Sequence, residues 1–190
     1  KIAKYVGSKY AVLVSSCSGG LHIACKALNV KKHSRVLTSP ITFVSTAAAA
    51  LHCGAKIILS DIDQNTINIS ENEIKKEIKK EKIDVIIPVH FSGLACDMKK
   101  ISTVAKSKKI KIIEDSAHAL GARYISGERV GSCKYSDATV FSFHPVKIIA
   151  GGEGGAVTTN SKTIYNKLLE YRSHGIIKDI RESFKNKKEG

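Results

Sequence analysis

Three short segments of the sequence carry side chains that could take part in catalysis, and the first contains Lys147. This lysine follows the strand-like residues 139–143 (TVFSF) and precedes the glycine-rich residues 151–155. Pro145 has no N–H to give to a strand ladder, so we expect it to end the strand and leave Lys147 just beyond. A lysine desolvated between apolar residues loses basicity and becomes nucleophilic, as a Schiff-base lysine must be. The alternative is a solvated loop lysine, in a chain with 31 Lys and Arg residues.

The second segment holds Asp115 and His118. Asp115 comes directly after the strand-like residues 111–114, and His118 follows three positions later. A carboxylate at a strand end can pair with a protonated ring nitrogen, and such pairing holds the pyridinium of pyridoxal phosphate as an electron sink. The alternatives are an N-cap role for Asp115 and a hydrogen-bonded core position for His118.

The third segment is a turn of small residues at 15–20 (SSCSGG), between the apolar run 10–14 and a helical pattern at 21–28. A turn of this kind at a helix N-terminus offers free backbone N–H groups, serine hydroxyls and the positive end of the helix dipole. Together these groups bind phosphate. The alternative is simple N-capping by Ser16 or Ser18, which needs no ligand.

The elements that must position these segments alternate between strands and helices. Apolar runs predict strands at 10–14, 35–39, 56–60, 84–88, 111–114 and 139–143. Helical patterns occupy 21–28, 44–52, 71–80, 98–107 and a segment from 160 onward. Strands with continuous rather than alternating apolar residues predict an α/β fold of three layers, with helices on both faces of a mostly parallel sheet. Sites in such sheets lie at the carboxyl ends of strands, so we expect residues 16–18, Asp115, Ser142 and Lys147 at one edge.

Composition narrows the possible partners. The net charge of +14 raises nucleic acid as a candidate, but the lysines are spread over helix faces and turns. With 6% aromatic residues and no Trp, the chain also has little to stack on bases. Solvated helix faces therefore explain the charge better than a nucleic-acid groove.

The cysteines indicate whether the chain binds a metal, and the apolar runs indicate where in the cell it is located. The five cysteines are odd in number and form no C-x-x-C pair, so we expect free buried thiols and no zinc or other metal site. No run approaches the roughly 20 apolar residues of a membrane span, and the first residues lack the apolar core of a signal peptide. We therefore expect a cytoplasmic protein that does not bind membranes.

Several segments closely resemble the DegT/DnrJ/StrS family of pyridoxal-phosphate-dependent nucleotide-sugar aminotransferases. The most specific are 112–122 (IIEDSAHALGA), 141–147 (FSFHPVK) and 152–160 (GEGGAVTTN), and 40–46 (PITFVST) and 53–56 (CGAK) match in the same order. Members of the family are fold-type-I enzymes about twice this length. The resemblance, together with a first residue other than Met, implies that residues 1–190 are a truncated large cofactor-binding domain, without the small C-terminal domain.

The resemblance also implies roles for residues at matching positions. Lys147 matches the lysine that forms the internal aldimine and then moves the proton between substrate and cofactor. Asp115 matches the partner of the pyridinium nitrogen, and His118 matches the residue beside the phenolic oxygen of the ring. These three are the expected catalytic residues.

Four further positions match residues that hold the cofactor. Phe43 matches an aromatic side chain that stacks on the ring face, a contact that a flat π-system fills well. Cys17, Ser18 and Ser142 match phosphate-binding positions. The family usually has Gly-Thr or Ala-Thr where this chain has Cys17-Ser18, and the change keeps the hydroxyl and the backbone N–H groups.

Within the family, residues 172–178 (RSHGIIK) and the FHPVK form are most similar to 4-aminotransferases of bacterial surface sugars, notably those of pseudaminic acid synthesis. The implied reaction transfers an amino group from glutamate to the 4-keto carbon of a UDP-linked N-acetyl dideoxy sugar, for surface polysaccharide or flagellin glycan. Lys147 argues against the dehydratases of the family, which carry histidine there. The alternatives are another nucleotide-sugar aminotransferase acting on a 3- or 4-keto group, or a non-catalytic binding remnant.

The resemblance further implies a homodimer, because relatives complete the phosphate site with residues from the partner chain. The sequence supports this to a limited extent. No arginine or lysine adjoins residues 16–18 or Ser142 in sequence, so a helix N-terminus must balance most of the phosphate charge.

Overall fold

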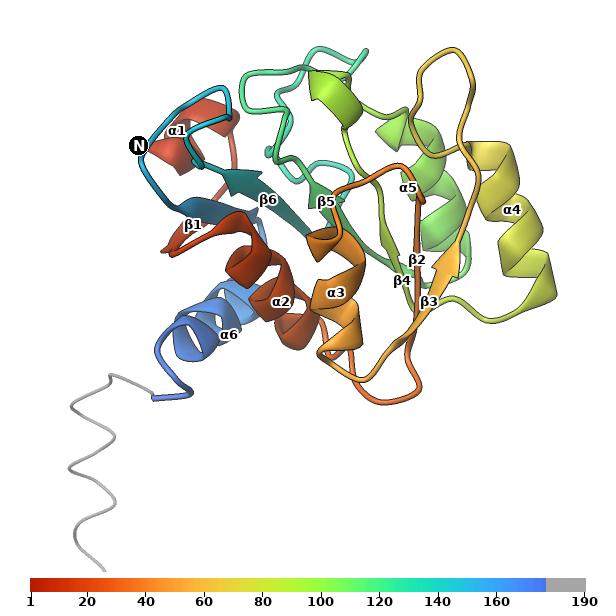
Figure 1. Ribbon diagram of the computed structural model, residues 1–190, viewed down its shortest axis with the longest axis horizontal. Coiled ribbons are helices and arrows are strands. Elements are labelled where there is room, and N and C mark those ends of the chain that lie inside the picture. Colours follow the sequence, from red (N-terminus) through yellow and green to blue (C-terminus); the bar gives the residue numbers. More distant parts are fainter. Residues whose placement is uncertain (177–190) are drawn as a thin grey trace, which may run out of the picture.

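Seven strands form a single sheet in the computed structural model, which describes residues 1–176 (Figure 1). The strands are β1 (Tyr10–Val14), β2 (Arg35–Thr38), β3 (Lys56–Leu59), β4 (Val85–Ile87), β5 (Lys111–Asp115), β6 (Ala138–Ser142) and β7 (Gly155–Thr159). Their order across the sheet is β1-β7-β6-β5-β4-β2-β3. Strand β7 pairs antiparallel with β1 and β6, and the other pairings are parallel. The predicted, mostly parallel sheet is confirmed.

Helices cover both faces of this sheet. They are α1 (Ile2–Val6), α2 (Cys17–Ala27), α3 (Ser45–Leu51), α4 (Glu71–Lys80), α5 (Met98–Ser107) and α6 (Lys162–Arg172), with a short 3-10 helix at Phe91–Gly93. One core layer joins Ile113 and Val140 to α2, α3 and α6, and the other joins Ile112 and Phe141 to α4 and α5. Neighbouring residues of one strand enter opposite layers because side chains alternate across a strand. The three-layer prediction is therefore confirmed.

Two boundaries differ from the prediction near the candidate site. Helix α2 begins at Cys17 rather than Leu21, because Ser16 caps it by accepting a hydrogen bond from Gly19 N at 3.1 Å. Strand β6 ends at Ser142, before Pro145 is reached. Phe143 N donates to Gly154 O at 2.9 Å, and Phe143 O accepts from Gly151 N at 2.8 Å, so the chain leaves the ladder toward the glycine loop.

The sequence does not predict strand β7, whose first residue, Gly155, belongs to the glycine-rich residues 151–155. All five residues of β7 are buried between β1 and β6. A Cβ atom at Gly155 would lie 2.7 Å from Phe141 O and 2.9 Å from Cys17 N. Glycine at this position therefore lets the start of α2 approach the sheet closely.

Other expectations concern thiols, metals and membranes. The five cysteines are free, and Cys25, Cys96 and Cys133 are buried. Within residues 1–176 there is no group of three or more His, Cys, Asp or Glu side chains arranged to hold a metal ion. No helix in that same part of the chain is long and apolar enough to cross a membrane. Ile177 and Lys178, part of the segment compared with 4-aminotransferases, lie outside the described residues.

Candidate active site

A cavity of about 530 Å³ lies at the carboxyl ends of β1, β5 and β6. All seven predicted site residues line it: Cys17, Ser18, Phe43, Asp115, His118, Ser142 and Lys147. They come from segments up to 130 residues apart in sequence, from position 17 to position 147. The structure therefore brings them together at one edge of the sheet, while their chemical roles stay predictions.

Asp115 is the last residue of β5, and its side chain is 5% exposed. Thr46 Oγ1 donates to Asp115 Oδ2 at 2.7 Å, and Ala117 N donates to Oδ1 at 3.1 Å. The bond from Ala117 N is local, as the N-cap alternative expects. The bond from Thr46 also links Asp115 to helix α3. Two donors hold the carboxylate in place and leave it further capacity to accept hydrogen bonds, since a carboxylate has about four lone-pair sites.

Lys147 is half-buried beside His118, and Lys147 Nζ lies 2.8 Å from His118 Nε2. Burial and the neighbouring Lys147 charge lower the pKa of His118, while Asp115 opposes them. A neutral imidazole can accept at Nε2 a hydrogen bond from the lysine amine. Lys147 is therefore held in the cavity wall, unlike the freely solvated loop lysine that was the alternative. His118 is half-buried rather than a core histidine.

The start of α2 forms another wall of the cavity. Ser16 caps the helix, as the alternative for this turn predicted, and Ser18 Oγ lies 2.6 Å from Ser45 Oγ. The N–H groups in the first turn of a helix have no intrahelical acceptors and point toward positions where an anion is stabilised. Burial raises the pKa of the Cys17 thiol far above its usual value, and Asp115 adds to this rise. Cys17 therefore stays a neutral thiol.

Two more predicted residues complete the wall. Ser142 ends β6 and is 6% exposed, and its hydroxyl accepts a hydrogen bond from His144 N at 3.4 Å. Phe43 precedes α3 and is 72% exposed, with its ring on the wall of the cavity. A planar apolar side chain in this place can cover one face of a flat ligand.

Sequence analysis missed three residues of this site. Thr46 holds Asp115 across 69 positions of sequence. It lies in the resembling segment 40–46, but no local pattern predicts that contact. Glu153 and His144 also line the cavity, with Glu153 Oε1 3.8 Å from His144 Nε2. Both lie within the segments that carry the family resemblance, which could have singled them out.

Comparison with known proteins agrees with this geometry. The profile of the DegT/DnrJ/EryC1/StrS aminotransferase family matches residues 1–190. This chain belongs to that family. It is 43% identical over 179 residues to the UDP-4-amino-4,6-dideoxy-N-acetyl-beta-L-altrosamine transaminase of Campylobacter jejuni subsp. jejuni serotype O:23/36 (strain 81-176), covering 93% of this chain and 46% of that protein.

Two solved structures share the fold. PseC of Helicobacter pylori, an aminotransferase involved in the biosynthesis of pseudoaminic acid, matches with a TM-score of 0.84 and 31% identity, over 94% of this chain and 48% of that one. NtdA of Bacillus subtilis with bound cofactor PMP matches with a TM-score of 0.86 and 28% identity, over 94% of this chain and 40% of that one. The chain thus spans about half the length of its relatives.

Proposed function

We propose that this chain is the cofactor-binding part of a pyridoxal-phosphate-dependent nucleotide-sugar aminotransferase. The observation that carries the proposal is the pairing of Lys147 with His118, in one cavity with the buried carboxylate of Asp115. The polar groups fit the three polar ends of pyridoxal phosphate. Lys147 offers an amine to the aldehyde, Asp115 a carboxylate to the ring nitrogen, and the start of α2 N–H groups and hydroxyls to the phosphate.

Each residue then has a defined task. Pyridoxal phosphate, when bound, supplies an electron-withdrawing ring. Asp115, fixed by Thr46 and Ala117, would keep a proton on the ring nitrogen. Lys147 would hold the aldehyde carbon and afterwards take up and return a proton at Nζ, while His118 Nε2 orients that amine. Phe43 would cover the ring face, and Cys17, Ser18 and Ser142 would bind the phosphate.

The proposed substrates are glutamate and a UDP-linked N-acetyl dideoxy sugar with a 4-keto group, for bacterial surface polysaccharide or flagellin glycan of the pseudaminic acid type. The 43% identity to the Campylobacter transaminase supports this choice. None of the residues that line the cavity is assigned here to the nucleotide. Another 3- or 4-keto nucleotide sugar is therefore the alternative substrate, and a cytoplasmic site of action remains the expectation.

We further propose that the full enzyme is a homodimer whose cavities are completed by the partner chain and by the C-terminal domain. Lys147 is the one Lys or Arg side chain among the described residues that line the cavity. Because its amine is assigned to the aldehyde, the phosphate is left with a helix N-terminus and neutral hydroxyls. An additional donor from outside this chain would balance the remaining charge.

The test uses the full-length enzyme, purified with pyridoxal phosphate, and compares Lys147→Ala with Lys99→Ala, an exposed lysine of α5. We expect a visible cofactor band in the wild type and in Lys99→Ala, and its loss in Lys147→Ala. Turnover with glutamate is then measured across a panel of UDP-linked 4-keto sugars. A cofactor band without turnover on any sugar would favour the binding remnant, and an unchanged band in Lys147→Ala would refute the proposal.

A further inference from the structure

A second acidic residue lies next to Asp115 but on the other face of the sheet. Glu114 precedes Asp115 in β5, and alternation along the strand sends the two side chains to opposite layers. Glu114 is 0% exposed and does not line the cavity. Burying a carboxylate costs folding free energy unless hydrogen bonds replace those it made to water. The hydrogen-bond partners of Glu114 therefore indicate its role.

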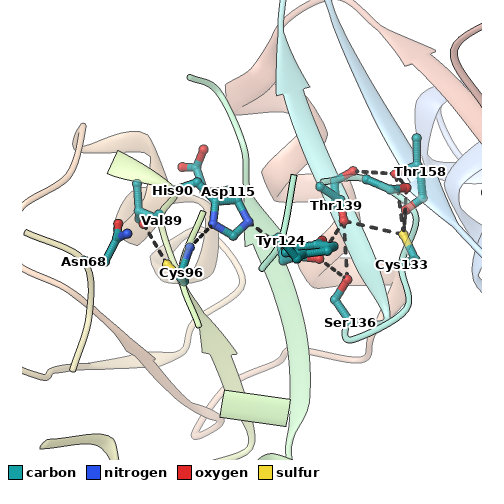
Figure 2. Close-up of polar contacts among 12 residues, drawn as sticks. Asn68, Val89, His90, Cys96, Asp115, Tyr124, Cys133, Ser136, Thr139 and Thr158 are labelled. Atoms are coloured by element: carbon teal, nitrogen blue, oxygen red, sulfur yellow. Dashed lines mark hydrogen bonds and ion pairs between the residues drawn. The ribbon is translucent and has the colours of Figure 1, made fainter. Parts of the chain in front are cut away.

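Four side chains donate hydrogen bonds to Glu114. Figure 2 labels these donors, which are His90, Tyr124, Ser136 and Thr139. His90 Nε2 and Tyr124 Oη each lie 2.7 Å from Oε2. Thr139 Oγ1 lies 3.0 Å from Oε1, which also accepts from the Ser136 hydroxyl. Burial by itself raises the pKa of Glu114, but the hydrogen bonds from His90, Ser136 and Tyr124 outweigh it and hold the pKa below its usual value.

The hydrogen bonds of His90 assign its tautomer. Its Nδ1 lies 3.0 Å from Cys96 N, and the backbone N–H of Cys96 donates to it. The ring proton must then be on Nε2, which donates to Glu114. In this arrangement the four donors to Glu114 are neutral, and within residues 1–176 no Lys or Arg forms an ion pair with it. Burial lowers the pKa of His90, whereas Cys96 and Glu114 raise it. The Cys96 N–H on Nδ1 keeps a second proton off the ring despite that rise. Glu114 is a buried negative charge with every lone pair in use.

His90 connects this cluster to Asp115. His90 N donates to Asp115 O at 3.1 Å, and Asp115 N donates to Pro88 O at 2.9 Å. Val89 lies between Pro88 and His90 in the sequence. It forms a parallel bridge to Asp115 and lines the cavity. The segment after β4 is thus fixed twice, by its backbone to Asp115 and by the His90 ring to Glu114.

We propose that Glu114 is a positioning residue of the active site. It holds the His90 ring, and through the backbone of His90 it fixes the end of β5, so that the Asp115 carboxylate stays directed into the cavity. Its negative charge would also favour a positive charge on the cofactor ring that is proposed to lie against Asp115. What Asp115 does in the cavity rests on the proposed function, but the fixing of its backbone does not.

The first test measures amide hydrogen exchange in the cofactor-free, full-length protein. Glu114→Gln keeps the size of the side chain but replaces one acceptor oxygen with a donor. We expect exchange at Asp115 and His90 to accelerate by about tenfold relative to Ile113, which lies earlier in the same strand. Ile101→Ala, a truncation in the core of α5, serves as the control for general destabilisation and should accelerate all three alike. Equal acceleration at Asp115, His90 and Ile113 in Glu114→Gln would overturn the proposal.

The second test follows the cofactor spectrum with pH in the holoenzyme. Glu114→Gln should shift the pH midpoint of the visible band, and Ile101→Ala should leave it unchanged, because lower stability alone does not alter the charge near the ring. Tyr124→Phe, which removes one donor and keeps the ring, should give a smaller shift and serves if Glu114→Gln does not fold. The same midpoint in all variants would contradict the proposal. Failure of the wild type to bind pyridoxal phosphate would instead refute the proposed function, and the exchange test would still stand.

Discussion

Asp115 and Glu114 are adjacent acids of one strand, and their surroundings give them opposite uses. Asp115 accepts two hydrogen bonds and lies on a cavity, whereas Glu114 accepts four and is enclosed. A carboxylate has about four lone-pair sites. Asp115 therefore keeps capacity for a ligand, and Glu114 has none left. Free acceptor capacity, rather than residue type, separates the acid that can do chemistry from the acid that supports it.

The two histidines show the same contrast. His118 is half-buried, and its Nε2 contacts the Lys147 amine at the cavity. His90 is fully buried, and both ring nitrogens are engaged, with Cys96 N and Glu114. The site thus consists of an open polar cluster backed, across the sheet, by a saturated one. Substitutions in the open cluster around Asp115 and His118 should mainly reduce activity. Substitutions in the saturated cluster around Glu114 and His90 should mainly reduce stability.

The largest expected effect is on the rate in Asp115→Asn. A neutral amide cannot keep a proton on the ring nitrogen, so the half-reaction with glutamate should slow by about 10²–10³-fold, while the contacts of Lys147 and the phosphate keep the cofactor bound. Single-turnover kinetics and a cofactor titration on the full-length enzyme measure both quantities. Near-normal turnover would refute the role given to Asp115.

Glu114→Ala should give the largest loss of stability. It leaves four buried donors without their acceptor, and each unsatisfied donor costs about 1–3 kcal/mol, so the free energy of unfolding should fall by at least about 3–5 kcal/mol. Asp115→Asn should change it by less than about 1 kcal/mol, because Asn can still accept from Thr46 or Ala117. Urea unfolding of the cofactor-free proteins gives both values. Similar losses in the two variants would remove the contrast between the two acids.

A smaller effect is expected for Thr46→Val, which keeps the shape of the side chain and removes the donor to Asp115 Oδ2. The carboxylate keeps its bond from Ala117, so we expect the half-reaction to slow by about three- to tenfold, with little change in cofactor affinity. Thr103→Val, at an exposed position of α5, is the matched control. A rate equal to that of the control would show that Thr46 does not position Asp115.

The smallest effect that we expect is on the stability of the folded chain at acidic pH. The pKa of Glu114 in the folded chain lies below its usual value of 4.5, so the unfolded chain binds more protons as the pH falls past that value. Stability contributed by Glu114 is therefore present above about pH 4.5 and is lost as the pH falls toward the folded pKa. Glu114→Gln should show a shallower fall of stability over this window. Parallel curves for the two proteins in urea unfolding would contradict the assignment.

The sequence predicted the parts of the fold that depend on local patterns. Helices α4 and α5 begin and end as predicted because their apolar residues repeat with helical spacing and both are bounded by polar residues. The positions of Asp115, Ser142 and Lys147 at or just after predicted strands correctly placed them at one edge of the sheet. Strand β7 was missed because it begins at a glycine of the loop, and its burial depends on pairing with β1 and β6.

Contacts between distant segments were beyond the sequence analysis. Thr46 reaches Asp115 across 69 positions, and His90 reaches Glu114 across 24. Glu114 itself was treated as part of a strand end, although a charged residue inside an otherwise apolar strand needs buried partners. Three of those partners come from the 124–139 segment packed against β5, and His90 comes from the segment after β4. No local pattern specifies either arrangement.

We propose above that Lys147 holds pyridoxal phosphate in this cavity. Borohydride reduction of the full-length holoenzyme, followed by peptide mass spectrometry, tests it most directly, because reduction fixes the cofactor on the lysine that holds it. Among the many lysines of this chain, we expect the added mass on Lys147 alone at stoichiometric cofactor. Labelling spread over surface lysines, with Lys147 unmodified, would refute the role given to Lys147.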